Sequence, residues 1–158
     1  MQWDPLSPDE ATRLQVAGED EFIEWLERGS SETFDVDKAW HGIHGVLTGS
    51  VGDEGHEFDG VVIGGVEFGP DSGYGPSHLV SADQVAALAE RLSALTVDDF
   101  RDRIDLAQLS ALGIYPDIWD REDEREENIS YLVDGYRVVR ERFVRAAEAG
   151  NAMCISIM

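Results

Sequence analysis

The longest helical pattern of the chain lies near its C-terminal end and is followed at once by a strand pattern. Residues 122–149 carry apolar side chains at helical spacing, namely Ile129, Leu132, Val133, Tyr136, Val139 and Phe143. Such a stripe predicts a helix with one buried face. Gly150 is a typical helix stop. Residues 151–158 then alternate Met153, Ile155 and Ile157 with Cys154 and Ser156, which predicts a terminal strand.

The rest of the chain reads mainly as helices. Capping boxes at Ser7–Glu10 and Ser81–Gln84, together with apolar stripes and glycine stops, mark helix boundaries. The predicted helices are 8–17, 19–28, 35 or 37 to 48, 81–95, 96–104 and 106–112. Strands are expected at 1–3 and at 61–69, where Gly64–Gly65 indicates a bulge or a hairpin turn, whereas 30–34, 51–60 and 70–77 are expected as loops.

Few strands among many helices do not form a βαβ repeat, so the predicted class is α+β. We expect a small mixed or antiparallel sheet packed against several helices. The long C-terminal helix should be followed by a terminal strand. A chain of 158 residues, with no linker or repeat, is expected to form a single domain, residues 1–158.

The charge balance restricts the partners. Thirty-three acidic and twelve basic residues give a formal net charge of −21. Such a surface repels nucleic-acid phosphates and anionic lipid headgroups, so neither a nucleic acid nor a membrane is an expected partner. It attracts a cation or a basic protein, although solubility alone also explains an acidic surface.

The N-terminal sequence and the cysteine content favour the cytoplasm. Cys154 is the only cysteine, which rules out an intrachain disulfide and fits a reducing compartment. The first ten residues, MQWDPLSPDE, lack the basic and apolar regions of a signal peptide. No apolar run approaches the length of a membrane span.

Two histidines stand three residues apart in the predicted helix AWHGIHGVLTGS. On a helical projection His44 lies about 40° from Trp40, on the apolar face, and His41 about 100° away, at its shoulder. The pair lacks clear further metal ligands, with only His56 and His78 in nearby loops, so no metal is expected. His44 is either a core histidine bonded to a carbonyl or carboxylate, or a ligand contact.

Gly42 and Gly45 lie on the other side of the same helix. Glycine inside a helix costs about 0.5–1 kcal/mol relative to alanine, so a compensating reason is expected. Either this side packs closely against another backbone, or it lines a space that a ligand enters.

The loop GPDSGYGPSH contains Tyr74 and His78 beside flexible glycines, and binding groups are often placed on such loops. It lacks the spacing of a phosphate-binding loop, and Asp71 would repel a phosphate. An ordinary turn before the Ser81 helix is the alternative interpretation.

The segment IYPDIWDREDEREEN offers a second candidate surface, with the side chains Tyr115, Trp119, Asp120, Glu122, Asp123 and Glu124. The acids at its end are also typical of a solvated helix start.

Several stretches together resemble the YfbM-like family of small bacterial proteins, a domain of unknown function. They are Asp37, Trp40, His44, Leu47, Thr48 and Gly49; IGG at 63–65; GYGPSHLVSADQVAALAERL at 73–92; IYPDIW at 114–119; and AAEAGNAMCISI at the end of the chain. The resemblance runs from about Asp35 to the C-terminal end. It implies a compact α+β domain and a cytosolic bacterial protein, and it brings no activity, cofactor or catalytic residues.

Three functional hypotheses follow. The first is a non-enzymatic acidic binding module that engages a protein partner, possible partners being basic proteins, with an antitoxin-like or immunity-like role as one form. The second is a small-molecule-binding or enzymatic protein with a pocket near Trp40, His44, Tyr74 and His78. The third is a surface used only for self-association, the expected state being a monomer or a weak homo-oligomer. No cofactor and no catalytic residue is assigned, because Cys154 lies in an apolar strand and no nucleophile motif occurs.

Overall fold

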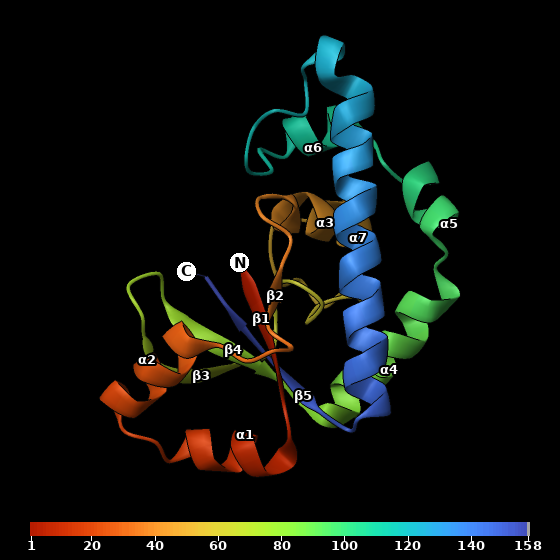
Figure 1. Cartoon of the computed structure of the whole chain (residues 1–158). Coiled ribbons are helices and arrows are strands. Elements are labelled where there is room, and N and C mark those ends of the chain that lie inside the picture. The colour runs from red at the N-terminus through yellow and green to blue at the C-terminus, as the bar shows by residue number, and fades with distance from the viewer. Residues whose placement is uncertain (158) are drawn as a thin grey trace.

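The computed structural model describes residues 1–157 and contains a five-stranded antiparallel sheet between two layers of helices (Figure 1). The strands are β1 (Gln2–Leu6), β2 (Phe34–Asp35), β3 (Val66–Asp71), β4 (Pro76–Val80) and β5 (Ala152–Ser156), in the order β2-β1-β5-β4-β3. The helices are α1 (Pro8–Gln15), α2 (Glu19–Arg28), α3 (Ala39–Thr48), α4 (Ala82–Ala94), α5 (Val97–Asp102), α6 (Leu106–Ala111), the short 3-10 helix η1 (Glu122–Glu124) and α7 (Arg125–Glu148). These observations confirm the predicted α+β class, with a long helix followed by a terminal strand.

Alternation along the strands sends side chains to two separate cores. Trp3 of β1 pairs with Ile155 of β5, and both lie in the larger core, under α3, α4 and α7. The next pair, Asp4 and Cys154, faces the other side, where α1 and α2 cover a smaller core. The sheet is therefore buried on both faces, and the site described below lies at one end of it.

Helix α7 runs well past the end of the sheet, and α3 and the segment around α6 lie beside its N-terminal half (Figure 1). It contacts α3 at Gly135, where a Cβ atom would lie 3.0 Å from Ile43 Cδ1. The predicted capping boxes at Ser7 and Ser81 are both formed. Gly49 ends α3 with a φ of 70°, a left-handed conformation that glycine adopts readily.

Four local predictions need correction. Residues 61–65 bend without forming a strand, and the strand there is β3, which begins at Val66 and extends into the expected loop. β2 and β4 are strands where the sequence pattern predicts a loop or no element. β2 pairs with β1, and β4 pairs with β3 in a hairpin and with β5, which lies far away in the sequence. The α3 cap is Lys38 and uses no side chain. The terminal strand is confirmed at 152–156, and Met158 lies outside the described residues.

Within residues 1–157, none of the helices combines the length and apolar character that crossing a bilayer requires.

Candidate functional site

Two adjoining hollows lie at the end of the sheet where both chain termini are found (Figure 1). The first, here called the cleft, has a volume of about 280 Å³ and is lined by Trp40, His41, Ile63, Tyr74 and His78, among others. The second, the trough, has a volume of about 700 Å³ and is lined by Gln2, Asp35, Asp37, Lys38 and Tyr115. Met1, Trp40, His41 and Ile157 line both hollows, so the two form one groove divided by these residues.

The β3–β4 hairpin positions one wall of the cleft. Asp71 Oδ1 accepts hydrogen bonds from the backbone amides of Gly73 at 2.7 Å and Gly75 at 2.9 Å. Both glycines have positive φ, which bends the chain tightly around the aspartate. Tyr74 is left at the tip with 71% of its surface exposed. The turn therefore projects an aromatic side chain over the cleft.

Helix α3 supplies a second wall of the cleft through Trp40 and His41, and its side with Gly42 and Gly45 is packed tightly against the core. A Cβ atom on Gly42 would lie 2.5 Å from Leu132 Cδ2 and 2.9 Å from the Trp119 ring. A Cβ atom on Gly45 would lie 2.8 Å from Leu109 Cδ2. Close packing is thus the reason for both glycines, although the contacts are with side chains and not with another backbone as expected.

An aromatic stack stands on the groove side of α3. The ring centroids of Trp40 and His41 are 4.9 Å apart with an interplanar angle of 14°. The Tyr115 ring lies 5.9 Å from that of Trp40. The rings of Trp40 and His41 belong to the partition between cleft and trough. The ring of Tyr115, from the segment after α6, lines one side of the trough.

Both nitrogens of His41 are engaged in hydrogen bonds. The Tyr115 amide donates to Nδ1 at 3.1 Å, so the neutral ring carries its proton on Nε2, which donates to the Val51 carbonyl at 3.1 Å. Burial lowers the pKa of His41, although the bond to the Val51 carbonyl acts in the opposite direction. The ring is therefore held neutral and fixed between two loops.

His44 lies outside the groove. It is 1% exposed, and its Nε2 donates to the Gly52 carbonyl at 3.1 Å. Burial lowers the pKa of His44, with the Gly52 carbonyl and the charge of Asp59 acting against it. Its role is to hold the chain that follows α3, so its predicted place in a pocket is corrected.

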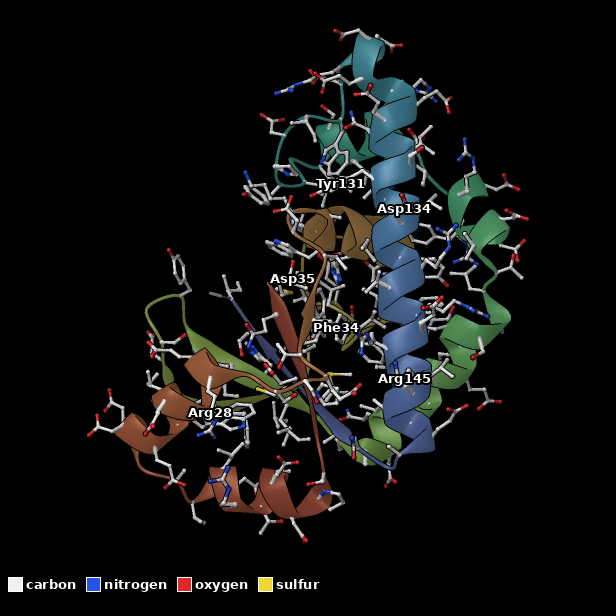
Figure 2. The ribbon with its side chains drawn as sticks, viewed as in Figure 1. Arg28, Phe34, Asp35, Tyr131, Asp134 and Arg145 are labelled. Carbon is white, nitrogen blue, oxygen red and sulfur yellow. The ribbon has the colours of Figure 1, made fainter. Side chains whose placement is uncertain are left out.

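Asp37 in the trough is held by α7. Tyr131 donates its hydroxyl proton to Asp37 Oδ2 at 2.9 Å and accepts a hydrogen bond from the Lys38 amide at 2.8 Å. Burial raises the pKa of Tyr131 to about 12, and the Asp37 carboxylate adds to this rise. Figure 2 shows Tyr131 on the part of α7 that extends beyond the sheet, above Asp35 of β2. The carboxylates of Asp35 and Asp37 are exposed.

The structure brings together three of the four predicted pocket residues, Trp40, Tyr74 and His78, and places His41 where His44 was expected. The hydrogen bonds that fix His41 depend on loops distant in sequence. In the sequence, the position of His41 next to Trp40 was the only indication that it lines the groove. Its place at the shoulder of the helix faces the groove in the structure. The sequence pattern predicts Asp35 or Asp37 as the cap of the helix, whereas the structure places both aspartates in the lining of the trough.

The predicted partner surface at 115–124 is divided by the fold. Trp119 is 2% exposed, and its Nε1 donates to the Ile114 carbonyl at 2.7 Å, so it is a core residue and not a partner contact. It fills the space left by Gly42. Tyr115 is exposed and joins the groove. The acids Asp120, Glu122, Asp123 and Glu124 lie around η1, away from the lining of the groove, with Glu124 paired to Arg121 at 3.1 Å.

Within residues 1–157, no three histidine, cysteine, aspartate or glutamate side chains converge as metal ligands would. His56 lies exposed in the loop after α3. Cys154 is buried in the smaller core, and burial raises its pKa to about 12.

Comparisons with known proteins give a family and a fold. The family model described as "Domain of unknown function (DUF1877)" matches residues 4–156. Among solved structures, the protein of unknown function YfbM from Escherichia coli is similar, with a TM-score of 0.74 and 19% sequence identity over 99% of this chain and 98% of that chain. At this identity the likeness shows a shared fold. No curated protein matches the sequence.

Proposed function

The chain belongs to the DUF1877 family, whose description names no activity, and from that premise we propose that it is a non-enzymatic binding protein that holds a peptide segment of a partner protein in the groove. We propose that it acts as a single domain in the cytoplasm. The groove carries this proposal, because it is the place where exposed apolar side chains gather.

Exposed apolar surface supports the proposal. Val51, Tyr74, Tyr115 and Ile157 are large hydrophobic residues with substantial exposure, and all four line the groove. Clustered apolar exposure is typical of interaction surfaces, whereas single exposed hydrophobic residues are common everywhere. Tyrosine and tryptophan are also the residues that most often carry binding energy at interfaces.

The charge of the chain supports a basic partner. A net charge of −21 raises the local concentration of cationic segments and speeds their encounter with the protein. Asp35 and Asp37 place two carboxylates inside the groove itself. Attraction at long range and contact at short range therefore favour the same class of partner.

The state of His41 supports binding over catalysis. A general base needs a nitrogen that can reach the proton it removes. Each ring nitrogen of His41 already has a backbone partner at 3.1 Å. Using either one for chemistry would break a bond that holds the wall of the groove.

The test is a selection of random 12-residue peptides displayed on phage against the intact protein. Affinities of the selected peptides can be measured by tryptophan fluorescence, because Trp3, Trp25 and Trp119 are buried and Trp40 lines the groove. We expect Tyr74→Ser to weaken binding by about 5- to 30-fold, the loss of one aromatic anchor.

The matched control is Val16→Ser, which removes another highly exposed hydrophobic residue, after α1 and outside the groove. Affinity should be unchanged in this variant. Both variants should unfold within about 0.5 kcal/mol of the parent, since both side chains are exposed. If no peptide is enriched, or if the selected peptides bind Tyr74→Ser as tightly as the parent, the proposal is wrong.

A small apolar molecule is the second candidate ligand, and the cleft favours it. Its lining is largely apolar, as small-molecule sites usually are, and its volume of about 280 Å³ lies near the lower end of their range of roughly 300–1,000 Å³. A thermal-shift screen tests it, because a ligand present at a hundred times its Kd stabilises by about 2.7 kcal/mol. A hit that is lost in Tyr74→Ser, together with a failed peptide selection, would favour this alternative.

A further inference from the structure

We propose that the groove recognises two neighbouring side chains of one peptide segment at once. An apolar side chain enters the cleft, and a lysine or arginine one to three residues away meets Asp35 and Asp37 in the trough. This inference rests on the proposed function and specifies the partner sequence that the groove selects.

The cleft is suited to one apolar side chain. Val62, Ile63 and Ile155 form apolar walls, with Trp40 and Tyr74 on either side. The space of about 280 Å³ is enough for one large side chain and too small for a folded element. Burying such a side chain against aromatic walls is the usual anchor of a peptide interface.

The trough is suited to a cation. Asp35 and Asp37 set two carboxylates beside the ammonium of Lys38 and the N-terminal amino group of Met1. Burial lowers the pKa of that amino group, which weakens it as a counter-charge to the two carboxylates, although the carboxylates themselves act in the opposite direction. Asp35 Oδ1 accepts a hydrogen bond from the Asp37 amide at 2.9 Å, and Asp37 Oδ2 accepts one from Tyr131 at 2.9 Å. A carboxylate can accept about four hydrogen bonds, so both keep capacity for a guanidinium or ammonium group. The internal bonds also fix the carboxylates in position before a ligand arrives.

The two hollows share their partition, and this sets the spacing. A segment that lies across the Trp40–His41 stack has the cleft on one side and the trough on the other. An extended chain advances about 3.3 Å per residue, and the hollows are separated only by residues that line both, so we place the two side chains one to three residues apart. The order of the two side chains along the segment depends on its direction.

The test is a double-mutant cycle between the protein and the tightest peptide from the selection. Three synthetic forms are compared: the parent peptide, a form with its basic residues changed to glutamine, and a form with its apolar anchor changed to alanine. The protein variants are Asp35→Asn/Asp37→Asn and Tyr74→Ser. Asparagine keeps an acceptor oxygen for the Asp37 amide and for Tyr131, and it tolerates the positive φ at position 37.

We expect Asp35→Asn/Asp37→Asn to weaken the parent peptide between about 2- and 30-fold, as two exposed ion pairs would, and to flatten the dependence of Kd on salt. The glutamine form should lose little further affinity in this variant, because the interaction that the cycle measures is already gone. In Tyr74→Ser, changing the apolar anchor of the peptide to alanine should likewise cost little further affinity, because the contact between the two side chains is already lost. Glu141→Gln/Glu148→Gln on α7 removes the same charge elsewhere and should leave the parent peptide bound at nearly full strength.

Three results would overturn the inference. Selected peptides that lack a basic residue near an apolar one would do so, and so would an equal loss in the α7 control. A cycle in which the losses simply add would show that Asp35 and Asp37 do not contact the basic residue. In each of these cases the proposed function still holds if the selected peptides depend on Tyr74 for binding. A selection that enriches no peptide would refute both the proposed function and this inference.

Discussion

Replacing Gly42 with alanine tests the packing that shapes the groove. Gly42 lies on the side of α3 opposite the Trp40–His41 stack, where the helix contacts Leu132 and Trp119. The new Cβ atom would lie 2.5 Å from Leu132 Cδ2 and 2.9 Å from two carbons of the Trp119 ring. Leu132 can shift the end of its side chain, but the Trp119 ring is held by its hydrogen bond to the Ile114 carbonyl. The strain therefore falls on the α3–α7 contact.

Two opposing effects set the magnitude. Overpacking a core by one methyl group costs about 1–3 kcal/mol. Alanine gains about 0.5–1 kcal/mol over glycine inside a helix. We therefore expect the free energy of unfolding to fall by about 1 kcal/mol, with about 2.5 kcal/mol as the upper limit, and Tm to fall by roughly 2–4 °C per kcal/mol.

Urea unfolding, followed by circular dichroism, gives the free energy directly, and the slope of the transition should stay unchanged. Gly52→Ala is the control, because nothing lies within 4 Å of a Cβ atom there and its φ is outside the left-handed region. It should be neutral or slightly stabilising. The loss in Gly42→Ala should also shrink in a Leu132→Val background. A Gly42→Ala protein as stable as its parent would refute the reasoning and reopen a ligand-lined role for that side of α3.

Other consequences of burial are open to direct measurement. The pKa of His44 is lowered by burial, so the folded protein binds fewer protons than the unfolded chain, and its stability should be full above pH 6.5 and fall as the pH drops below that value. His44→Gln keeps a donor for the Gly52 carbonyl and should reduce the difference between urea midpoints at pH 7.5 and 5.5; an unchanged difference would contradict this. The pKa of Asp4 is raised by burial, so its ionised form opposes folding, and Asp4→Asn should stabilise the protein at pH 7.5 while the gain vanishes below pH 3.8. Cys154, with a pKa of about 12, should not react with a thiol reagent at pH 8 until urea unfolds the chain, and rapid labelling of the folded protein would show that the smaller core opens.

The helices could be predicted because their signals are local. The capping boxes at Ser7 and Ser81 each involve residues three apart, and both are formed as the sequence indicated. β4 could not be found in the same way. Its residues Ser77 and His78 give no clear alternation, and its strand state depends on pairing with β3 and with β5, more than seventy residues further along.

Residue types in the sequence indicate several side chains that line the groove. The direction in which each side chain points could not be predicted. Trp40, Tyr74 and His78 were singled out as aromatic and titratable side chains near glycines, and they line one cleft. The choice of His44 over His41 rested on a helical projection, which orders residues around an axis without saying what lies beyond them. Trp119 and Gly42 were interpreted separately, although the ring of one occupies the space left by the other.

The order of strands has a consequence for synthesis. β5 holds the centre of the sheet, between β1 from the start of the chain and β4 from its middle. Without residues 152–156 the sheet is two separate strand pairs, β2–β1 and β4–β3, each with an open edge facing the gap. Contacts between segments so distant in sequence form slowly, because a long loop must close first. During synthesis on the ribosome, these edges stay unpaired until β5 has emerged. Such unpaired strand edges invite aggregation, so a chain interrupted shortly before β5 would be both without its groove and prone to associate.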